Sequence, residues 1–336
     1  MKNGICVAGN SIVDTLYPIE RYPGPGELAA IKDVSRATGG ALNNVAMDLA
    51  QLDPSLPLQV VGIIGKDEDG DFIEKQLGRF PNISLDGLIR CGDVRTSFTL
   101  VMSDAGTKQR TFFTYGGGGS VLCEDDFDWA AIKAELFHIG YILLLDTLDE
   151  PDATYGTRMA RLLKQARDHG KKTSVDIVSE ASDRFKKLVP PALRYVDYCV
   201  INELEAQQAT GICLRDSGGA LARENMVAAL SALFGMGVST WAVIHAPEGA
   251  FAMDGAGTYI EKPGARLPKG YIKGTVGAGD AFCAGILYAA YSEKPLDEAL
   301  TMGHASAVCS LAGEDTTSGM REMAQAVALY EEYGVK

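Results

Sequence analysis

The stretch most suited to take part in a reaction is Gly277-Ala278-Gly279-Asp280. It consists of three small residues and an acid, and it precedes a run of apolar residues. The pattern predicts a tight turn that enters the first turn of a buried helix. Such a turn leaves backbone N–H groups free at the positive end of the helix dipole, so Gly277, Ala278 and Gly279 can form an anion site. A carboxylate does not bind an anion. We therefore interpret Asp280 as a general base that takes a proton from a hydroxyl attacking a phosphoryl group.

Taken alone, that stretch is better explained as an ordinary helix N-terminus, where acidic residues are common. A second stretch, Gly39 to Ala50, changes this interpretation. Gly39 and Gly40 precede a predicted helix with one apolar face, and they leave room for a small ligand against the backbone. Asn44, in the first turn, offers the donor and the acceptor that a sugar hydroxyl needs. By itself this pair of glycines with a nearby Asn is more often a helix cap.

Together the two stretches resemble the two signature regions of the ribokinase, or phosphofructokinase-B, family of carbohydrate kinases. The resemblance covers nearly the whole chain, in the family's order, and includes Asn202 and Glu205 as the family's Asn-x-x-Glu. Other segments that match are 9–14, 108–112 and 136–140. The joint pattern is specific for the family and says little about the exact substrate.

The resemblance assigns roles to several residues. Asp14 would hold sugar hydroxyls, and Gly39, Gly40 and Asn44 would complete the sugar pocket. The backbone N–H groups of residues 277–279 would stabilise charge on the transferring phosphoryl group, with Asp280 as the base.

The resemblance to the family also implies a metal. Asn202 and Glu205 would support Mg²⁺, with Glu205 acting through the ion's water ligands near the phosphates, since Mg²⁺ keeps several waters and needs few protein oxygens. The same spacing also forms a capping box at a helix start. Two further substrate-binding candidates come from position alone. Asp146 follows a predicted strand at Tyr141–Leu145, and Arg110 is either a cation near the substrate or an exposed arginine.

The chain also departs from the family pattern. Gly274 stands where potassium-activated relatives carry an Asp, so we expect little potassium activation. The nucleotide loop appears as residues 244–249, which places Ala246 and Gly249 beside the nucleotide but lacks the family's Thr hydroxyl. His304 occupies a position where many relatives carry Asn near the adenine; it could contact the base or serve packing. Residues 176–180 replace a motif seen in several sugar kinases.

The charge balance excludes two classes of partner. With a net charge of −13, the chain is not expected to bind nucleic acid or an anionic membrane.

The seven scattered cysteines include no Cys-x-x-Cys pair, which predicts reduced core thiols. The first apolar run is too short for a signal peptide, and no run approaches the length of a membrane span. These observations predict a cytoplasmic protein.

Short apolar strands alternate with amphipathic helices, which predicts an α/β fold: a ribokinase-like three-layer αβα sandwich with a mostly parallel sheet. The expected strands are Ile5–Ala8, Gln59–Ile64, Leu136–Ile139, Thr173–Asp176, Tyr198–Ile201 and Trp241–His245. The expected helices are Gly40–Leu52, Asp69–Phe80, Ala153–His169, Glu203–Thr210, Ala220–Phe234, Ala278–Tyr291 and Leu296–Leu311.

Two segments break this alternation, at about 14–38 and 94–115. Both look extended, the second around a turn at residues 104–106, and the family places a small β-sheet lid there that covers the substrate. We define the lid as these two segments. The run Gly116–Ser120 is interpreted as a mobile loop at the lid edge. We expect residues 1–336 to form a single kinase domain, with a homodimer through the lid because an exposed sheet edge favours pairing.

The sequence therefore predicts a Mg²⁺-dependent, ATP-using kinase that phosphorylates a hydroxyl of a sugar-like small molecule. One alternative is a nucleoside kinase of the same fold, in which aromatic residues of the lid supply a stacking platform: Tyr17, Tyr22, Phe112 and Phe113. Another is a non-catalytic sugar- or nucleotide-binding regulator, which the retained Asp280 disfavours. The chain has no Walker motif and no dinucleotide fingerprint after its first strand.

Overall fold

The computed structural model describes residues 3–104, 106–107, 109–179 and 183–334. Three positions used above lie outside the described residues: the turn residue at 105, Lys108 of the matching segment 108–112, and residue 180. Among the described residues, no helix is both long enough and apolar enough to cross a membrane.

The larger sheet lies at the centre of the molecule. Its described strands follow the order β15-β14-β13-β12-β11-β8-β1-β4-β5, and they are parallel except for β14 and β15 at one edge. The bounds are β1 Ile5–Gly9, β4 Leu58–Gly65, β5 Ile83–Cys91, β8 Leu136–Ile142, β11 Lys172–Ile177, β12 Tyr198–Asn202, β13 Trp241–Ala246, β14 Gly249–Asp254 and β15 Tyr259–Pro263. Strands such as β1 are buried along their whole length, as expected for a parallel sheet covered on both faces.

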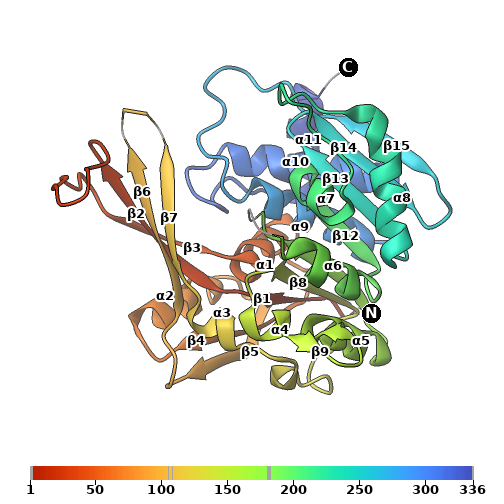
Figure 1. Ribbon diagram of the computed structural model, residues 1–336, viewed down its shortest axis with the longest axis horizontal. Helices are drawn as coiled ribbons and strands as arrows, with labels where there is room; N and C mark the ends of the chain where they lie inside the picture. The colour runs from red at the N-terminus through yellow and green to blue at the C-terminus, as the bar shows by residue number, and fades with distance from the viewer. Residues whose placement is uncertain (1–2, 105, 108, 180–182, 335–336) are drawn as a thin grey trace.

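Helices cover both faces of this sheet, giving three layers (Figure 1). One face packs against α1 Ala41–Leu52, α2 Glu68–Leu77, α9 Ala278–Tyr291, α10 Leu296–Leu311 and α11 Met323–Tyr333. The other packs against α5 Arg158–Asp168, α6 Phe185–Leu193, α7 Glu203–Thr210 and α8 Met226–Met236. Short helical pieces complete the described structure: α3 Gly117–Val121, α4 Asp146–Asp149 and 3₁₀ turns at Glu124–Asp126 and Arg223–Asn225. The predicted αβα sandwich is confirmed.

A separate four-stranded sheet stands beside the central layers (Figure 1). Its order is β3-β2-β6-β7, from β2 Ile12–Ile19, β3 Ser35–Gly39, β6 Ser97–Asp104 and β7 Arg110–Tyr115. These strands lie in and beside the two segments that define the lid. Every residue of β7 is exposed, and this strand forms one edge of the small sheet.

Several predicted elements are corrected by the structure. The helix expected from Ala153 begins at Arg158, because residues 151–157 form a short hairpin of β9 Pro151–Asp152 and β10 Gly156–Thr157. The Thr157 hydroxyl then caps α5 by accepting from the N–H of Ala160 at 3.1 Å. The helix expected from Ala220 begins at Met226, because residues 215 and 221 pair as an isolated bridge.

Two more corrections lie near the lid. The run Gly116–Ser120 is not an irregular loop but largely α3, whose backbone is tied to β6: the Ser97 hydroxyl donates to Gly116 O at 2.5 Å and accepts from Gly119 N at 3.0 Å. The strand expected at Tyr141–Leu145 ends at Ile142, the last residue of β8. The chain then turns, and Asp146 is the first residue of α4 rather than the end of a strand.

Candidate functional site

The two glycine-containing stretches meet at Asp280, the third residue of α9. One carboxylate oxygen, Oδ2, accepts a hydrogen bond from Asn44 Nδ2 of α1 at 2.8 Å. The other, Oδ1, accepts from the Tyr141 hydroxyl at the end of β8 at 2.6 Å. Residues 236 positions apart in the chain are thereby joined, and both donors orient the carboxylate. The contact between Asn44 and Asp280 follows from the extensive packing of α1 on α9.

The turn before α9 requires glycine at its cap position. Gly277 has φ of 84°, in the left-handed region, and a Cβ there would lie 2.8 Å from the Cβ of Thr316. The helix begins at Ala278, so the N–H groups of its first turn lack intrahelical acceptors. The positions of Gly277, Ala278 and Gly279 therefore match those of an anion site at the positive end of a helix that is 14 residues long.

Asp280 lies at the wall of a cavity of about 500 Å³ at the carboxyl ends of the parallel strands. Burial raises the pKa of Asp280, while the hydrogen bonds from Tyr141 and Asn44 lower it in part. Tyr141 stays protonated, because burial and the neighbouring Asp280 raise its pKa well above its usual range. A carboxylate with a raised pKa, held by two donors and facing a cavity, is suited to accept a proton.

The predicted sugar-binding residues lie where β2 and β3 join the central layers. Asp14 on β2 rests directly over Gly39, since a Cβ at Gly39 would fall 2.3 Å from Asp14 Oδ2. Burial raises the pKa of Asp14 to about 6. The next residue, Gly40, precedes α1, which carries Asn44. Asp14, Gly39, Gly40 and Asn44 therefore lie near one another where the small sheet meets α1, and all but Asp14 are buried.

The strand register shows which face of the small sheet accompanies Asp14. Asp14 pairs with Thr99 of β6, which pairs with Thr114 of β7, so these three side chains share one face. Phe112 and Arg110 alternate onto the same face. Arg110 is exposed at the outer end of β7, and its contact with substrate stays a prediction.

Asp146 lies in different surroundings. Its Oδ2 accepts from the Ser120 hydroxyl at 2.6 Å, which joins α4 to the end of α3. It lines a separate shallow hollow with Arg184 rather than the cavity that contains Asp280. The structure therefore does not bring Asp146 together with the other predicted site residues.

Asn202 and Glu205 form the capping box at the start of α7. The Asn202 side chain accepts from the N–H groups of Leu204 and Glu205, and Glu205 Oε2 accepts from Asn202 N at 2.9 Å. Glu205 Oε1 also accepts from Asn202 Nδ2 and from the Ser179 hydroxyl, each at 2.7 Å. Both carboxylate oxygens of Glu205 thus have protein donors, and both residues line the cavity.

A second buried carboxylate, Asp176 at the end of β11, faces Glu205 across the cavity. Burial raises the pKa of both groups, to about 7 for Glu205, and the charge of Glu205 raises the pKa of Asp176 further. A cation between them would relieve this repulsion, and carboxylate oxygens are the donors that Mg²⁺ prefers. The described residues contain no cluster of three or more His, Cys, Asp or Glu side chains that could hold a metal ion. Because both oxygens of Glu205 already accept from protein donors, the donor set fits an ion that keeps most of its water ligands.

The predicted nucleotide-binding residues are only partly brought together. Ala246 and Gly249 face each other across the tight turn between β13 and β14, beside the cavity. His304 is buried in the helical layer, where its ring stacks on Tyr330 with 5.4 Å between centroids and meets Phe282 edge-on at 5.5 Å. This environment matches the packing alternative for His304, and its contact with adenine stays a prediction.

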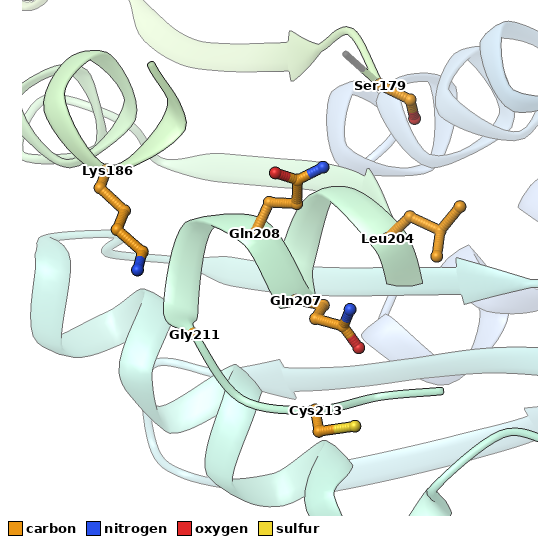
Figure 2. Close-up of a pocket in the computed structure, with 7 residues that line it drawn as sticks. All are labelled: Ser179, Lys186, Leu204, Gln207, Gln208, Gly211 and Cys213. Atoms are coloured by element: carbon orange, nitrogen blue, oxygen red, sulfur yellow. The ribbon is translucent and has the colours of Figure 1, made fainter. Parts of the chain in front are cut away.

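A further hollow of about 600 Å³ lies along α7 and is distinct from the cavity at Asp280 (Figure 2). Leu204, Gln207 and Gln208 of α7 and Lys186 of α6 line it, and Figure 2 shows the three α7 side chains leaving the helix in different directions. Ser179 contributes to both spaces. Apart from that residue, this hollow contains none of the groups that surround Asp280.

Among the cavity-lining residues that sequence reasoning missed, three carry polar groups at strand ends: Tyr141, Asp176 and His245. Each lies at the carboxyl end of a parallel strand, β8, β11 and β13 respectively. Ligands of α/β sheets bind outside these strand ends. A search of the polar residues at the ends of the predicted strands would have found all three.

Comparisons with solved structures agree with this architecture. The Arabidopsis thaliana ribokinase complexed with ribose and ATP superposes with a TM-score of 0.79 at 20% identity, covering 98% of this chain and 99% of that one. A nucleoside kinase from Methanocaldococcus jannaschii, described as an archaeal member of the ribokinase family, gives a TM-score of 0.74 at 17% identity, covering 98% of both chains. The protein therefore has the ribokinase fold.

Sequence comparison defines the family. The family model described as pfkB family carbohydrate kinase matches residues 2–323, and the chain belongs to this family. Among curated relatives, the ribokinase of Staphylococcus aureus is 25% identical over 213 residues, which are 63% of this chain and 64% of the relative. The bifunctional ribokinase/ribose-5-phosphate isomerase A of Fructilactobacillus sanfranciscensis is 25% identical over 65% of this chain and 37% of the relative. Both matches span less than two thirds of the relative's length.

Proposed function

We propose that this protein is an ATP-dependent phosphotransferase that phosphorylates a hydroxyl of a sugar or sugar-like small molecule. The observation that carries the proposal is the pair of hydrogen bonds to Asp280 at the start of α9, from Tyr141 and Asn44. They hold the carboxylate at the start of α9, whose first N–H groups form the proposed anion site, and they join it to Asn44, one of the predicted sugar-binding residues. Membership of the pfkB family and the ribose and ATP bound by the Arabidopsis relative support the same assignment.

In the proposed reaction the acceptor hydroxyl lies between Asp280 and the terminal phosphoryl group of ATP. The hydroxyl oxygen forms a bond to the γ-phosphorus, and the bond between that phosphorus and the bridging oxygen breaks. Asp280 takes the hydroxyl proton, and ADP leaves with the electron pair of the broken bond. The N–H groups of residues 277–279 stabilise the negative charge on the transferring group.

The acceptor would be held by Asp14, Gly39, Gly40 and Asn44. Asp14, when ionised, accepts hydrogen bonds from sugar hydroxyls, and the lack of a side chain at Gly39 leaves room for the Asp14 carboxylate itself. The small sheet that carries Asp14 would act as the lid, excluding water from the phosphoryl group and so limiting hydrolysis of ATP. Asp146 and Arg110 would be peripheral contacts at most.

The nucleotide would lie along the cavity toward Ala246 and Gly249. Mg²⁺ bound there would neutralise phosphate charge as a Lewis acid. Asp176, Asn202 and Glu205 would hold it, Glu205 through water because its oxygens already accept from Asn202 and Ser179. We expect little stimulation by potassium, since Gly274 offers no side-chain oxygen beside the carbonyls of Gly313 and Glu314, which lie 3.2 and 3.4 Å from its Cβ position.

The proposal is tested by measuring ADP release with Mg-ATP over a panel of free sugars, sugar phosphates and nucleosides. Asp280→Asn is expected to lower kcat by at least about 100-fold. Its fold should be preserved, because Asn44 Oδ1 has no partner in the described structure and can turn to accept from the new amide. An unfolding midpoint equal to that of the native protein would show that the fold of Asp280→Asn is preserved. Turnover that survives in a folded Asp280→Asn variant would refute the base assignment.

A nucleoside acceptor is the second candidate, and one observation favours it. Phe112 is 57% exposed and shares the face of the small sheet that carries Asp14, so its ring could stack on a base. If the acceptor is a nucleoside, Phe112→Leu should raise its KM by about 10-fold. Phe113→Leu, on the opposite face, is the matched control. An equal response of the two variants would remove this argument.

Three expectations accompany the function. We propose that residues 1–336 act as a single kinase domain, which the extent of the family match supports. A second copy of the chain would pair through the lid, where apolar side chains are exposed. The cytoplasmic location and the absence of nucleic-acid and membrane partners stay predictions.

A further inference from the structure

His245, the fifth residue of β13, lines the cavity that contains Asp280 but has no assigned role. Within the described part of the chain, no hydrogen bond or ion pair engages its ring nitrogens. An imidazole ring carries at least one N–H donor whether it is neutral or protonated. A ring at a cavity wall with no partner among the described residues is suited to bind a ligand.

The orientation of the ring is defined by its neighbours. A Cβ on Gly279 would lie 3.5 Å from His245 Cε1 and 3.9 Å from Nε2, so this edge of the ring faces the start of α9. Phe282, one turn further along α9, packs on the ring with 4.9 Å between centroids. The imidazole is therefore held against the same helix start whose N–H groups form the proposed anion site.

The order of the strands indicates which substrate His245 would meet. Moving across the sheet, β8, β11, β12 and β13 are successive neighbours, and they supply Tyr141, Asp176, Asn202 and His245 to the cavity. The proposed acceptor site lies at the β8 end, where Tyr141 holds Asp280. His245 lies at the opposite end, next to the turn between β13 and β14.

We propose that His245 Nε2–H donates a hydrogen bond to a phosphate oxygen of the nucleotide bound at Gly277–Gly279. The inference rests on the proposed function and adds a ligand that the family motifs in this chain do not supply. No proton is transferred in this interaction. The ring supplies a donor on the side of the phosphates away from Asp280.

The test compares His245→Leu and His245→Asn by calorimetric titration with Mg-ADP and with adenosine, which lacks phosphates. His245→Leu should bind Mg-ADP about 10-fold more weakly while adenosine binding is unchanged, since a hydrogen bond to a charged group is lost. His245→Asn, which retains an N–H donor, should recover part of the affinity. His169→Leu, at the end of α5 and outside the cavity, is the control and should bind as the native protein does.

Unchanged Mg-ADP binding by His245→Leu would overturn the inference, and so would equal losses for Mg-ADP and adenosine, which would indicate a packing role with Phe282. A measurement on the native protein guards against misfolded variants: the ring ¹⁵N signals of His245 should shift on addition of Mg-ADP and not of adenosine. No shift would also overturn it. If the native protein turns over substrate and His245→Leu binds Mg-ADP with native affinity, only this inference is contradicted. If the native protein does not bind Mg-ADP at all, the proposed function is contradicted as well.

Discussion

Asp280 is a buried carboxylate whose surroundings act on its pKa in opposite directions. Burial raises the pKa, and the two hydrogen bonds lower it. The balance matters because a general base must be ionised at the working pH and still accept a proton in the transition state. Tyr141 and Asn44 thus set both the direction of the carboxylate and its proton affinity.

Removing one donor should reveal this balance. Tyr141→Phe keeps the ring but loses the 2.6 Å hydrogen bond, so the pKa of Asp280 should rise. We expect kcat to fall by about 10-fold at pH 7 and the acid limb of the kcat–pH profile to move to higher pH. Tyr155→Phe, in the turn between β9 and β10, is the control. An unchanged acid limb in Tyr141→Phe would contradict a role for the hydroxyl in tuning the base.

Asp14 predicts a separate pH dependence. Its pKa is raised to about 6, so the carboxylate is ionised above that pH and becomes protonated as the pH falls through it. The protonated form accepts sugar hydroxyls poorly, and kcat/KM for the acceptor should therefore decline below about pH 6. Asp14→Asn should lower kcat/KM by at least about 10-fold and abolish this inflection. Measuring kcat/KM for the acceptor between pH 5 and 8 in the native protein and in Asp14→Asn tests this prediction. The same inflection in both profiles would show that Asp14 is not the titrating group.

At the scale of single residues, the sequence predicted the site residues that belong to motifs. It missed the site residues that reach the cavity only because their strands are neighbours in the sheet. The Gly277–Asp280 turn and Asn44 were predicted, and the structure joins them. Tyr141, Asp176 and His245 were missed because their importance depends on which strands are neighbours, and sequence order does not give the order β8-β11-β12-β13.

Among the elements, α1 carries an unusual buried group. Asp48 lies one turn after Asn44 and is fully buried, and neither carboxylate oxygen has a hydrogen-bond partner in the described structure. The charged or titratable groups that face it are Asp280 from α9, Asp315 from the loop after α10, and Cys309 of α10. Burial and the two acids raise the pKa of Asp48 well above its usual range. Folding therefore requires this carboxyl to take up a proton near neutral pH.

This requirement makes Asp48 a source of instability as the pH rises. In the unfolded chain Asp48 ionises near pH 4, whereas in the folded protein it stays protonated, so its presence lowers the free energy of unfolding progressively above pH 4. Asp48→Ala should raise the free energy of unfolding by roughly 1–3 kcal/mol at pH 8 and by less at pH 5. Urea unfolding at both values measures this difference. Lower stability of the variant at pH 8 would mean that Asp48 has a favourable partner in solution.

Elements were predicted well where one periodic pattern fills the whole segment. The ranges of α7, α9 and α10 agree with those expected; a capping box opens α7, whereas α9 and α10 follow Gly277 and Pro295 without a side-chain cap. The starts of α5 and α8 were wrong, since residues 151–157 and 215–222 form local β contacts that a helical pattern conceals. Strands β14 and β15 were missed; they form the antiparallel edge of the sheet, and turns of two and four residues respectively precede them.

For the whole molecule, the central sheet and the small sheet have different roles. The central sheet is covered on both faces and fixes Asp280, Asp176 and His245 at its strand ends. The small sheet leaves an edge strand, β7, with all its residues exposed. Leu28, Ile31, Val34 and Phe113 add exposed apolar surface in the lid segments. Exposed sheet edges and apolar patches are the usual sites of association between chains.

The last prediction concerns this surface. If a second copy of the chain covers it, the native protein should sediment as a dimer at micromolar concentration. Phe113→Lys should shift it to a monomer, because the ring is 56% exposed in a single chain and a buried lysine in the pair would be costly. Val227→Lys, on α8 and 46% exposed, is the matched control that should leave the dimer intact.

The two outcomes also bear on catalysis. A monomeric Phe113→Lys variant with a raised KM for the acceptor and an unchanged kcat would show that pairing steadies the sheet carrying Asp14, since Asp280 and its donors lie in the central layers. A native protein that sediments as a monomer would exclude the dimer. The exposed face of β7 would then be open to solvent in the absence of substrate, and closure of the small sheet over the cavity would have to bury it.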